Sequence, residues 1–237
     1  MITIALDTAT DRCSVAASAG DRVLTRQLDG ARQHNAAILG LIGELLHELG
    51  GQPRDISRVL VADGPGSFTG LRVAAAVAKA LVWGRPEVTW SAAPSLLVRA
   101  FPHAPPAGGT VLALADALRG ELYAAMWRFG AERVEPVLTP RTLAPADLPS
   151  DADLVVGSVP LALREAVTAA SGREPIVGND ALPDARSLLA LSRWVGGVHL
   201  VSDPAHWEPT YGRPAEAQAV WERKHGQPLP TPTDRLG

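Results

Sequence analysis

Residues 1–27, M-I-T-I-A-L-D-T-A-T-D-R-C-S-V-A-A-S-A-G-D-R-V-L-T-R-Q, decide the fold. An apolar run ends abruptly at Asp7, and the turn pair Gly20-Asp21 separates two further runs of β-compatible residues. The pattern predicts three strands joined by short turns. They cover residues 1–6, 13–19 and 22–27, and consecutive strands of this kind form an antiparallel meander.

Helices and strands alternate after this meander. Helical periodicity predicts one helix over residues 33–49, ended by Gly50-Gly51, and another over residues 71–83. A further strand follows the second helix, and a short buried strand at residues 59–62 lies between the two helices. A helix that joins two strands of one sheet needs a crossover, so this strand is expected to run parallel to the first one.

The second half repeats this order after a proline- and glycine-rich break at residues 102–109. An apolar strand at residues 110–115 ends at Asp116, much as the first strand ends at Asp7, and Arg119-Gly120 supplies a turn. We therefore predict two α/β domains of similar topology. The later elements are strands at 121–129, 133–138 and 154–156, and helices near 161–170 and 185–195.

Composition restricts the function classes. The 237 residues carry 22 basic and 25 acidic side chains, a net charge of −3, with two lysines and no basic run, which argues against a protein that grips nucleic acid by itself. The single Cys13 excludes an intrachain disulfide and a cysteine-based zinc site. No apolar run approaches the ~20 residues of a membrane span. With no signal peptide at the start, a cytoplasmic location is expected.

The most specific segment is residues 63–72, D-G-P-G-S-F-T-G-L-R, between a strand and a helix. Three glycines and a proline imply unusual dihedrals or a close approach of the backbone. Ser67 or Thr69 can cap the helix that begins near Gly70. The segment is either a phosphate cradle at a helix N-terminus or a structural or interface turn, and it lacks the Lys-Ser/Thr pair of a Walker A loop.

The two N-terminal helices predict a docking surface. Ala36, Gly40 and Gly43 lie opposite the apolar stripe of the first helix, where a surface helix normally carries charge. Each interior glycine costs about 1 kcal/mol relative to alanine, so we expect a compensating close contact, the alternative being a tolerated surface glycine. The second helix is apolar nearly all round except at Arg72 and Lys79, which indicates burial on more than one side.

The candidates for chemistry are few. D-T-A-T at residues 7–10 follows the first strand, where the carboxyl ends of parallel strands place ligands. We expect nucleotide contacts from Asp7, Thr8 and Thr10, and from their counterpart Asp116, unless the carboxylates simply cap their turns. The six histidines form no helical metal pair, and no Ser-His-Asp or Cys-His arrangement can be nominated, so neither a metal site nor a catalytic residue is predicted.

Five motifs together resemble the TsaB (YeaZ) family over nearly the whole chain, to about residue 225. They are G-P-G-S-F-T-G-L-R at 64–72, D-T-A-T at 7–10, R-Q-H-N at 32–35, A-D-A-L-R-G-E-L-Y at 115–123 and E-P-T-Y-G-R at 208–213. The resemblance implies an α/β chain with the actin-like ATPase fold, two lobes of ribonuclease-H-like topology. It places the first lobe at 1–105, the second at 106–213, a C-terminal helix returning to the first lobe at 214–225, and a disordered tail at 226–237.

The resemblance also implies a function. It is that of a non-catalytic subunit that pairs with the catalytic subunit TsaD and activates it to threonylcarbamoylate the adenosine next to the anticodon of tRNAs reading codons that start with A. In this family the small ATPase TsaE joins the pair. From the residues themselves, the apolar helix pair predicts a homodimer when the chain is alone, the charge balance predicts that tRNA is met only through the complex, and no membrane partner is expected. ATP or ADP with magnesium at the complex interface is left open.

Carried over by position, the docking surface comprises residues of the glycine-rich segment and of both helices. They are Ala36, Gly40, Gly43, Gly64, Gly66, Ser67, Phe68, Thr69, Gly70, Arg72, Ala76 and Lys79. Two other functions compete with this one. One is a free-standing actin-fold phosphotransferase that uses Asp7 and Asp116 around magnesium-ATP, and the other is a metallopeptidase, against which the missing metal ligands argue.

Overall fold

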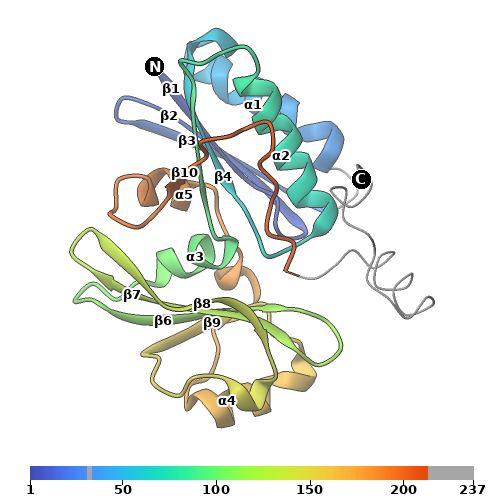
Figure 1. Cartoon of the computed structure of the whole chain (residues 1–237), viewed down its shortest axis with the longest axis vertical. Coiled ribbons are helices and arrows are strands. Elements are labelled where there is room, and N and C mark those ends of the chain that lie inside the picture. Colours follow the sequence, from blue (N-terminus) through green and yellow to red (C-terminus); the bar gives the residue numbers. More distant parts are fainter. Residues whose placement is uncertain (31–33, 213–237) are drawn as a thin grey trace, which may run out of the picture.

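The computed structural model describes residues 1–30 and 34–212, and the side chains of residues 34–36 lie outside that description. Two sheets lie one above the other (Figure 1). The first has the strand order β10-β5-β4-β1-β2-β3. Its strands are β1 Ile2–Asp7, β2 Arg12–Ala19, β3 Arg22–Asp29, β4 Ile56–Ala62, β5 Thr89–Ala93 and β10 His199–Leu200. In the described residues, no helix is both long and apolar enough to cross a membrane.

The meander and the parallel crossover are confirmed. Ala5 of β1 pairs with Ala16 of antiparallel β2 on one side and with Leu60 of parallel β4 on the other. Alternate residues of β1 enter different cores, as the two-residue period of a strand requires. Ile4 packs in the core shared with helices α1 (His34–Glu48) and α2 (Phe68–Val82), whereas Ala5 packs in the core on the opposite face of the sheet.

The second sheet repeats the first. Its order is β8-β7-β6-β9, with β6 Gly109–Asp116, β7 Leu122–Gly130, β8 Arg133–Leu143 and β9 Leu154–Gly157. Strands β6, β7 and β8 are antiparallel, and β9 runs parallel to β6. The order β3-β2-β1-β4 of the first sheet therefore recurs as β8-β7-β6-β9, and the predicted duplication of topology is confirmed.

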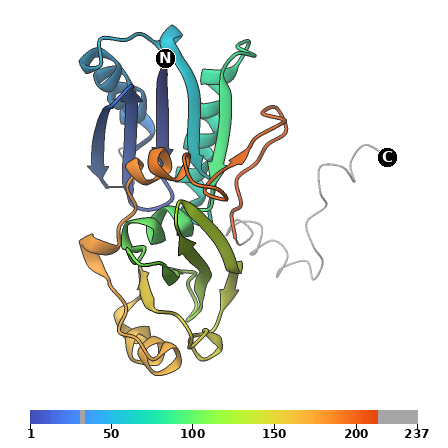
Figure 2. The same cartoon turned by 90° about the vertical axis from the view of Figure 1, so that its left-hand side faces the viewer.

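Short helices fill the space between the sheets. Figures 1 and 2 place α3 (Ser95–Ala100) and α5 (Arg186–Leu191) between them, and both contribute leucines to the central core. Helix α4 (Arg164–Ser171) covers the far face of the second sheet. The remaining short helices are 3-10 turns at Pro53–Asp55, Phe101–His103, Pro145–Asp147, Leu161–Leu163 and Gly178–Ala181.

Several element predictions need correction. The strand expected after the second helix is β5. Helix α3 and strand β10 were not predicted, because all six residues of α3 are buried and show no helical periodicity, and β10 has only two residues. The helix expected at 185–195 ends at Leu191 in α5. The helix expected at 161–170 begins as the 3-10 turn Leu161–Leu163 before α4.

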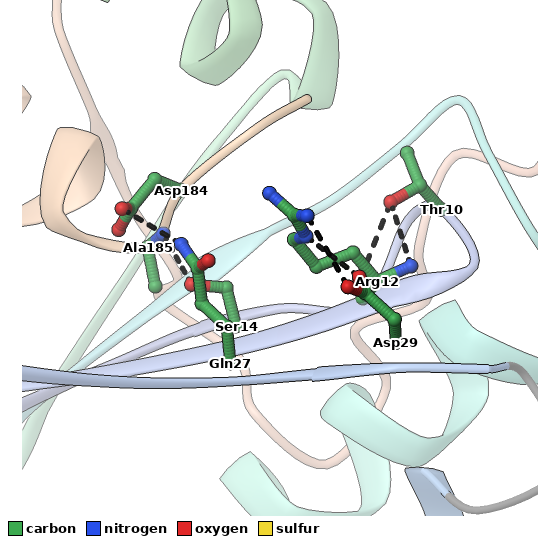
Figure 3. A network of polar contacts seen from close by, with 7 residues as sticks. All are labelled: Thr10, Arg12, Ser14, Gln27, Asp29, Asp184 and Ala185. Carbon is green, nitrogen blue, oxygen red and sulfur yellow. Dashed lines mark hydrogen bonds and ion pairs between the residues drawn. The ribbon is translucent and has the colours of Figure 1, made fainter. Parts of the chain in front are cut away.

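The two lobes contact each other at places other than the connecting segment near residue 105. The expected boundary at residue 105 falls between the 3-10 turn Phe101–His103 and β6, but the range 106–213 includes β10, which pairs with β5 of the first sheet. Figure 3 shows the joint at residues 184 and 185. The Ala185 amide donates to Ser14 Oγ (3.0 Å), and Gln27 Nε2 donates to Asp184 Oδ2 (2.9 Å).

The same close-up shows how β2 and β3 are held beside this joint. Arg12 forms an ion pair with Asp29 (2.8 Å), and the Thr10 hydroxyl accepts a hydrogen bond from the Arg12 amide (Figure 3). The expected C-terminal helix at 214–225 and the expected tail at 226–237 lie outside the described residues.

Candidate functional site

The glycines of the segment between β4 and α2 are packed against backbone. A Cβ added at Gly64 would lie closer than 3.0 Å to the carbonyl oxygen of Thr210. A Cβ added at Gly66 would also lie closer than 3.0 Å to the Ala9 carbonyl oxygen, and one added at Gly70 would lie that close to the Thr8 carbonyl oxygen. These three glycines, which we call the loop glycines, are thus explained by close approach within the chain.

Hydrogen bonds fasten this segment to the end of β1. The Ser67 amide donates to the Ala9 carbonyl (2.8 Å), and the Thr8 hydroxyl donates to the Gly70 carbonyl (2.7 Å). Ser67 Oγ accepts from the Gly70 amide (3.3 Å), so Ser67 is the helix cap, and Thr69 lies inside the first turn of α2. These contacts favour the structural turn over the phosphate cradle.

A segment near the end of the described chain lies across α2. This segment, residues 203–211, is called the strap below. The Tyr211 ring stacks on Phe68 with centroids 4.6 Å apart, and the Arg72 guanidinium lies 5.4 Å from the centre of the same Phe68 ring. The Tyr211 hydroxyl also donates to Glu208 (3.1 Å). Part of the expected docking surface is therefore engaged by the chain itself.

The strap is held at two further points. Lys79 Nζ donates to the Ala205 carbonyl (3.2 Å) and lies 3.8 Å from Glu208. Trp207 packs on the fully buried Trp90, with ring centroids 4.6 Å apart. The sequence did not predict this arrangement, because the strap residues show neither strand alternation nor helical periodicity.

The outward side of α1 and α2 is open. The two helices lie side by side on one face of the first sheet (Figure 1), and Gly40, Gly43 and Ala76 are exposed. Within the described part of the chain, nothing lies within 4 Å of a Cβ added at Gly40 or Gly43, so the expected close contact is not made internally. Two large apolar residues that the sequence reasoning missed join them: Leu39 is 62% exposed and Trp83 is 82% exposed.

We call these five residues the open helix face. Trp83 could have been found from sequence, because it ends the alanine-rich second helix at a position in line with Ala76. The side chain of Ala36, also expected on this surface, lies outside the described residues.

The four residues expected to contact nucleotide differ in how deeply they are buried. Asp7 and Thr8 are fully buried, because the loop glycines pack on this end of β1, whereas Thr10 is half-buried and Asp116 is exposed. Asp7 Oδ1 accepts from the Ala9 amide (3.0 Å), and Asp116 Oδ1 accepts from the Leu118 amide (2.7 Å). Both carboxylates therefore cap the turn after their strand, as the alternative reading proposed.

A cleft of about 1040 Å³ opens between the lobes. Thr10, Ser67 and Phe68 line it from the first lobe, Asp116 from the second, and Tyr211 from the strap. Asp7 and Thr8 lie outside its lining. The structure thus brings Thr10 and Asp116 to one cleft and leaves the other two expected contacts in the packed interior.

Burial shifts the ionisation of two carboxyls near this region. Desolvation raises the pKa of Asp7 to about 6, and it raises the pKa of Asp63, the residue that follows β4, to about 7. The ring of His199 lies 3.4 Å from Asp63 Oδ2, and its own pKa is lowered by desolvation. Among the described residues, no three His, Cys, Asp or Glu side chains gather as they would around a metal ion.

Comparison with known proteins defines the class. Two lobes with the same strand order around a cleft form the actin-like ATPase fold. The model of the TsaD family, described as tRNA N6-adenosine threonylcarbamoyltransferase, matches residues 28–152, more than half of the chain. YeaZ from Pseudomonas aeruginosa has a similar structure, with a TM-score of 0.68 and 25% identity over 81% of this chain and 90% of its own.

Curated relatives narrow the assignment. The tRNA threonylcarbamoyladenosine biosynthesis protein TsaB of Bacillus subtilis (strain 168) is 27% identical over 229 residues, which cover 93% of this chain and 98% of the relative. The Escherichia coli (strain K12) protein of the same name is 33% identical over 144 residues, 58% of this chain and 62% of the relative. The chain belongs to the TsaB (YeaZ) family.

Proposed function

We propose that this chain is a non-catalytic subunit in the biosynthesis of threonylcarbamoyladenosine in tRNA. In this proposal it pairs with TsaD and activates it to threonylcarbamoylate the adenosine next to the anticodon of tRNAs that read codons starting with A. The names of the relatives support the pathway. The open helix face is the observation that carries the pairing.

The helix glycines would be unfavourable without a partner. Gly40 and Gly43 each cost the helix about 1 kcal/mol relative to alanine, and nothing in the described chain packs on them. Leu39 exposes a large apolar side chain four residues before Gly43, and Trp83 exposes another at the end of α2. A face that combines missing side chains with exposed apolar ones suits a partner whose backbone approaches closely. The same face would pair two copies of the chain when TsaD is absent.

The charge balance supports a role through the complex. A chain with a net charge of −3 lacks the excess of basic side chains that phosphate neutralisation needs. In this proposal tRNA is therefore bound by the complex and not by this subunit alone. The participation of TsaE, and of ATP or ADP with magnesium at the subunit contact, remains a prediction.

Reconstitution tests the proposal directly. Purified chain, TsaD and TsaE are combined with tRNA, ATP and threonylcarbamoyl-adenylate, and the modified nucleoside is measured after digestion of the tRNA. We expect no modification by this chain alone and a large stimulation when it is added to TsaD. Modification by the chain without TsaD, or no stimulation of TsaD, would refute the proposal.

Two variants test the face itself. Gly43→Leu and Ala76→Glu should weaken co-purification with TsaD by about 100-fold or more, since both place bulk or charge where the partner backbone approaches. Circular dichroism should be unchanged, because both positions are exposed. The matched controls are Gly130→Leu and Ala166→Glu, at exposed positions of the second lobe. If both test variants bind TsaD like the unmodified chain, the face is wrongly assigned.

A further inference from the structure

Arg72 is an exposed cation that has no counter-ion in the described structure. It lies in the second turn of α2, and its guanidinium is 5.4 Å from the centre of the Phe68 ring. No carboxylate of the described residues lies within ion-pair distance of it, and α2 contains no acidic residue that could pair with it along the helix. The positive charge of Arg72 is therefore unused within the described chain.

The acidic side chains on the elements beside α2 are engaged elsewhere. They belong to helix α1 and to the strap, and each of them pairs with a basic residue of the chain. The pairs are Glu44 and Glu48 with Arg26, Glu208 with Lys79, and Asp203 with His206. An acid of α1 or of the strap would have to leave one of these pairs in order to reach Arg72.

An aromatic stack holds the guanidinium in place. Phe68 precedes Arg72 by four residues, so both side chains lie on one side of α2, and the face of an aromatic ring attracts a cation. The Phe68 ring is in turn stacked on Tyr211 of the strap, with centroids 4.6 Å apart. Because this ring is held, Arg72 loses less conformational freedom on binding than a free surface arginine does. Arginine and aromatic residues are also enriched among the residues that contribute most to protein interfaces.

Arg72 belongs to the same stripe of α2 as the open helix face. The exposed residues of this stripe recur at helical spacing. They are Thr69, Arg72, Ala76, Ala80 and Trp83, and Arg72 is the only charged one. A partner that covers Ala76 therefore reaches Arg72 as well. An arginine that is buried without an acceptor is strongly unfavourable, so this partner must supply one.

From these contacts we propose that Arg72 is the charged anchor of the docking surface and pairs with an Asp or Glu side chain of the partner. The partner is TsaD, because the assignment rests on the pairing proposed above. A guanidinium donates two parallel hydrogen bonds to a carboxylate, which fixes the orientation of the two proteins. The open helix face supplies apolar contact, whereas Arg72 supplies specificity, since a protein without the matching acid would leave a buried charge unpaired.

Binding of the full chain to TsaD, measured by titration calorimetry without tRNA, tests the anchor. Arg72→Met should weaken binding by about tenfold or more at low salt. Its affinity should also fall less than that of the unmodified chain when sodium chloride is raised from about 0.05 M to about 0.5 M, because the screened ion pair is absent. The matched control is Arg141→Met, an exposed arginine of β8 whose guanidinium bonds to Thr139 of its own strand, and it should bind like the unmodified chain.

Charge reversal identifies the acid. Arg72→Glu should weaken binding by about 100-fold or more, because two carboxylates would then face each other. One Asp→Lys or Glu→Lys variant among the exposed acids of TsaD should restore about tenfold or more of this loss. Restoration by none of them would overturn the pairing with a carboxylate.

Two results separate the anchor from the pairing function. No binding of the unmodified chain to TsaD would refute both, whereas equal affinity and equal salt dependence of Arg72→Met and the unmodified chain would overturn the anchor alone. The Tm of isolated Arg72→Met should stay within about 3 °C of the unmodified chain, since no internal ion pair is lost. A larger fall would place the counter-ion within the chain itself and would also overturn the proposal.

Discussion

The loop glycines and the helix glycines of α1 are the same residue type in opposite surroundings. Gly64, Gly66 and Gly70 each meet backbone from another part of the chain, so that even one methyl group would collide. Gly40 and Gly43 face open space in the described structure. The first group is explained by the fold alone, whereas the second group is unfavourable for the fold and needs an explanation outside it.

The docking surface predicted from the sequence therefore consists of two regions with different surroundings. The loop glycines and the strap form a packed region, in which Phe68 and Lys79 already have partners within the chain. In the described residues, the open helix face has no packing partner outside α1 and α2. A glycine-rich motif and a glycine-bearing helix therefore need different explanations even when they are neighbours, and only the surroundings distinguish them.

Gly70→Ala tests most directly whether the loop glycines are required by close packing. Its Cβ would meet the carbonyl oxygen of Thr8, a backbone atom that can move only if β1 moves. We expect the free energy of unfolding to fall by about 3–5 kcal/mol, measured by urea denaturation. Gly43→Ala is the control from the other group. A loss of less than about 1 kcal/mol in Gly70→Ala would show that the loop tolerates a side chain.

The packed region also contains Asp7, and pH tests its burial. The pKa of Asp7 is about 6 in the folded protein and 3.8 in the unfolded chain, so its contribution to stability is fully present below pH 3.8 and is lost as the pH rises through 6. This loss amounts to about 3 kcal/mol.

Asp7→Asn removes that titration. Between pH 4 and pH 7, the free energy of unfolding of this variant should therefore fall by about 3 kcal/mol less than that of the unmodified protein. Asp116→Asn, at the equivalent position of the second lobe, should follow the unmodified protein. Parallel profiles for Asp7→Asn and the unmodified chain would mean that Asp7 is solvated.

Removing a strap contact should have a smaller effect. Tyr211→Ala loses the stacking on Phe68 and the hydrogen bond to Glu208, which should lower the free energy of unfolding by about 1–2 kcal/mol. Tyr211→Phe keeps the ring and should lose less than about 1 kcal/mol, since the hydroxyl bond is exposed. Equal losses in chemical denaturation of the two variants would assign the stability to the hydroxyl group.

The smallest effect has the opposite sign. Gly43→Ala fills open space in a helix and should raise the free energy of unfolding of the isolated chain by up to about 1 kcal/mol. The same change should weaken binding to TsaD, measured by titration calorimetry. A variant that is both more stable and equally tight in binding would separate the helix glycines from the docking role.

Much of the fold could be predicted because its signals are local. The runs that end at Asp7 and Asp116, together with the turn pairs Gly20-Asp21 and Arg119-Gly120, were sufficient for the duplicated sheets. The missed elements lack such signals. Helix α3 is buried on all sides, and β10 is two residues long and exists only because β5 offers a free edge.

The site was harder to predict because it depends on contacts between distant residues. The sequence identified the glycine-rich segment and its Ser67 cap, but not that Ala9 and Thr210 would pack on its glycines. It ranked Asp7 as a ligand contact because strand ends often bind ligands, and it had no means of knowing that the carboxyl is buried. The cleft carried no motif of its own, since its lining comes from both lobes and depends on how they meet.

The late position of β10 has a consequence for synthesis on the ribosome. Helices α1 and α2 have been translated by residue 82, but the free edge of β5 is covered only when residues 199–200 emerge. From residue 94 to residue 198 of translation, the nascent chain therefore exposes both an apolar helix surface and an unpaired strand edge. Such species aggregate most readily, so chaperone binding should matter most for this chain before its last forty residues are made.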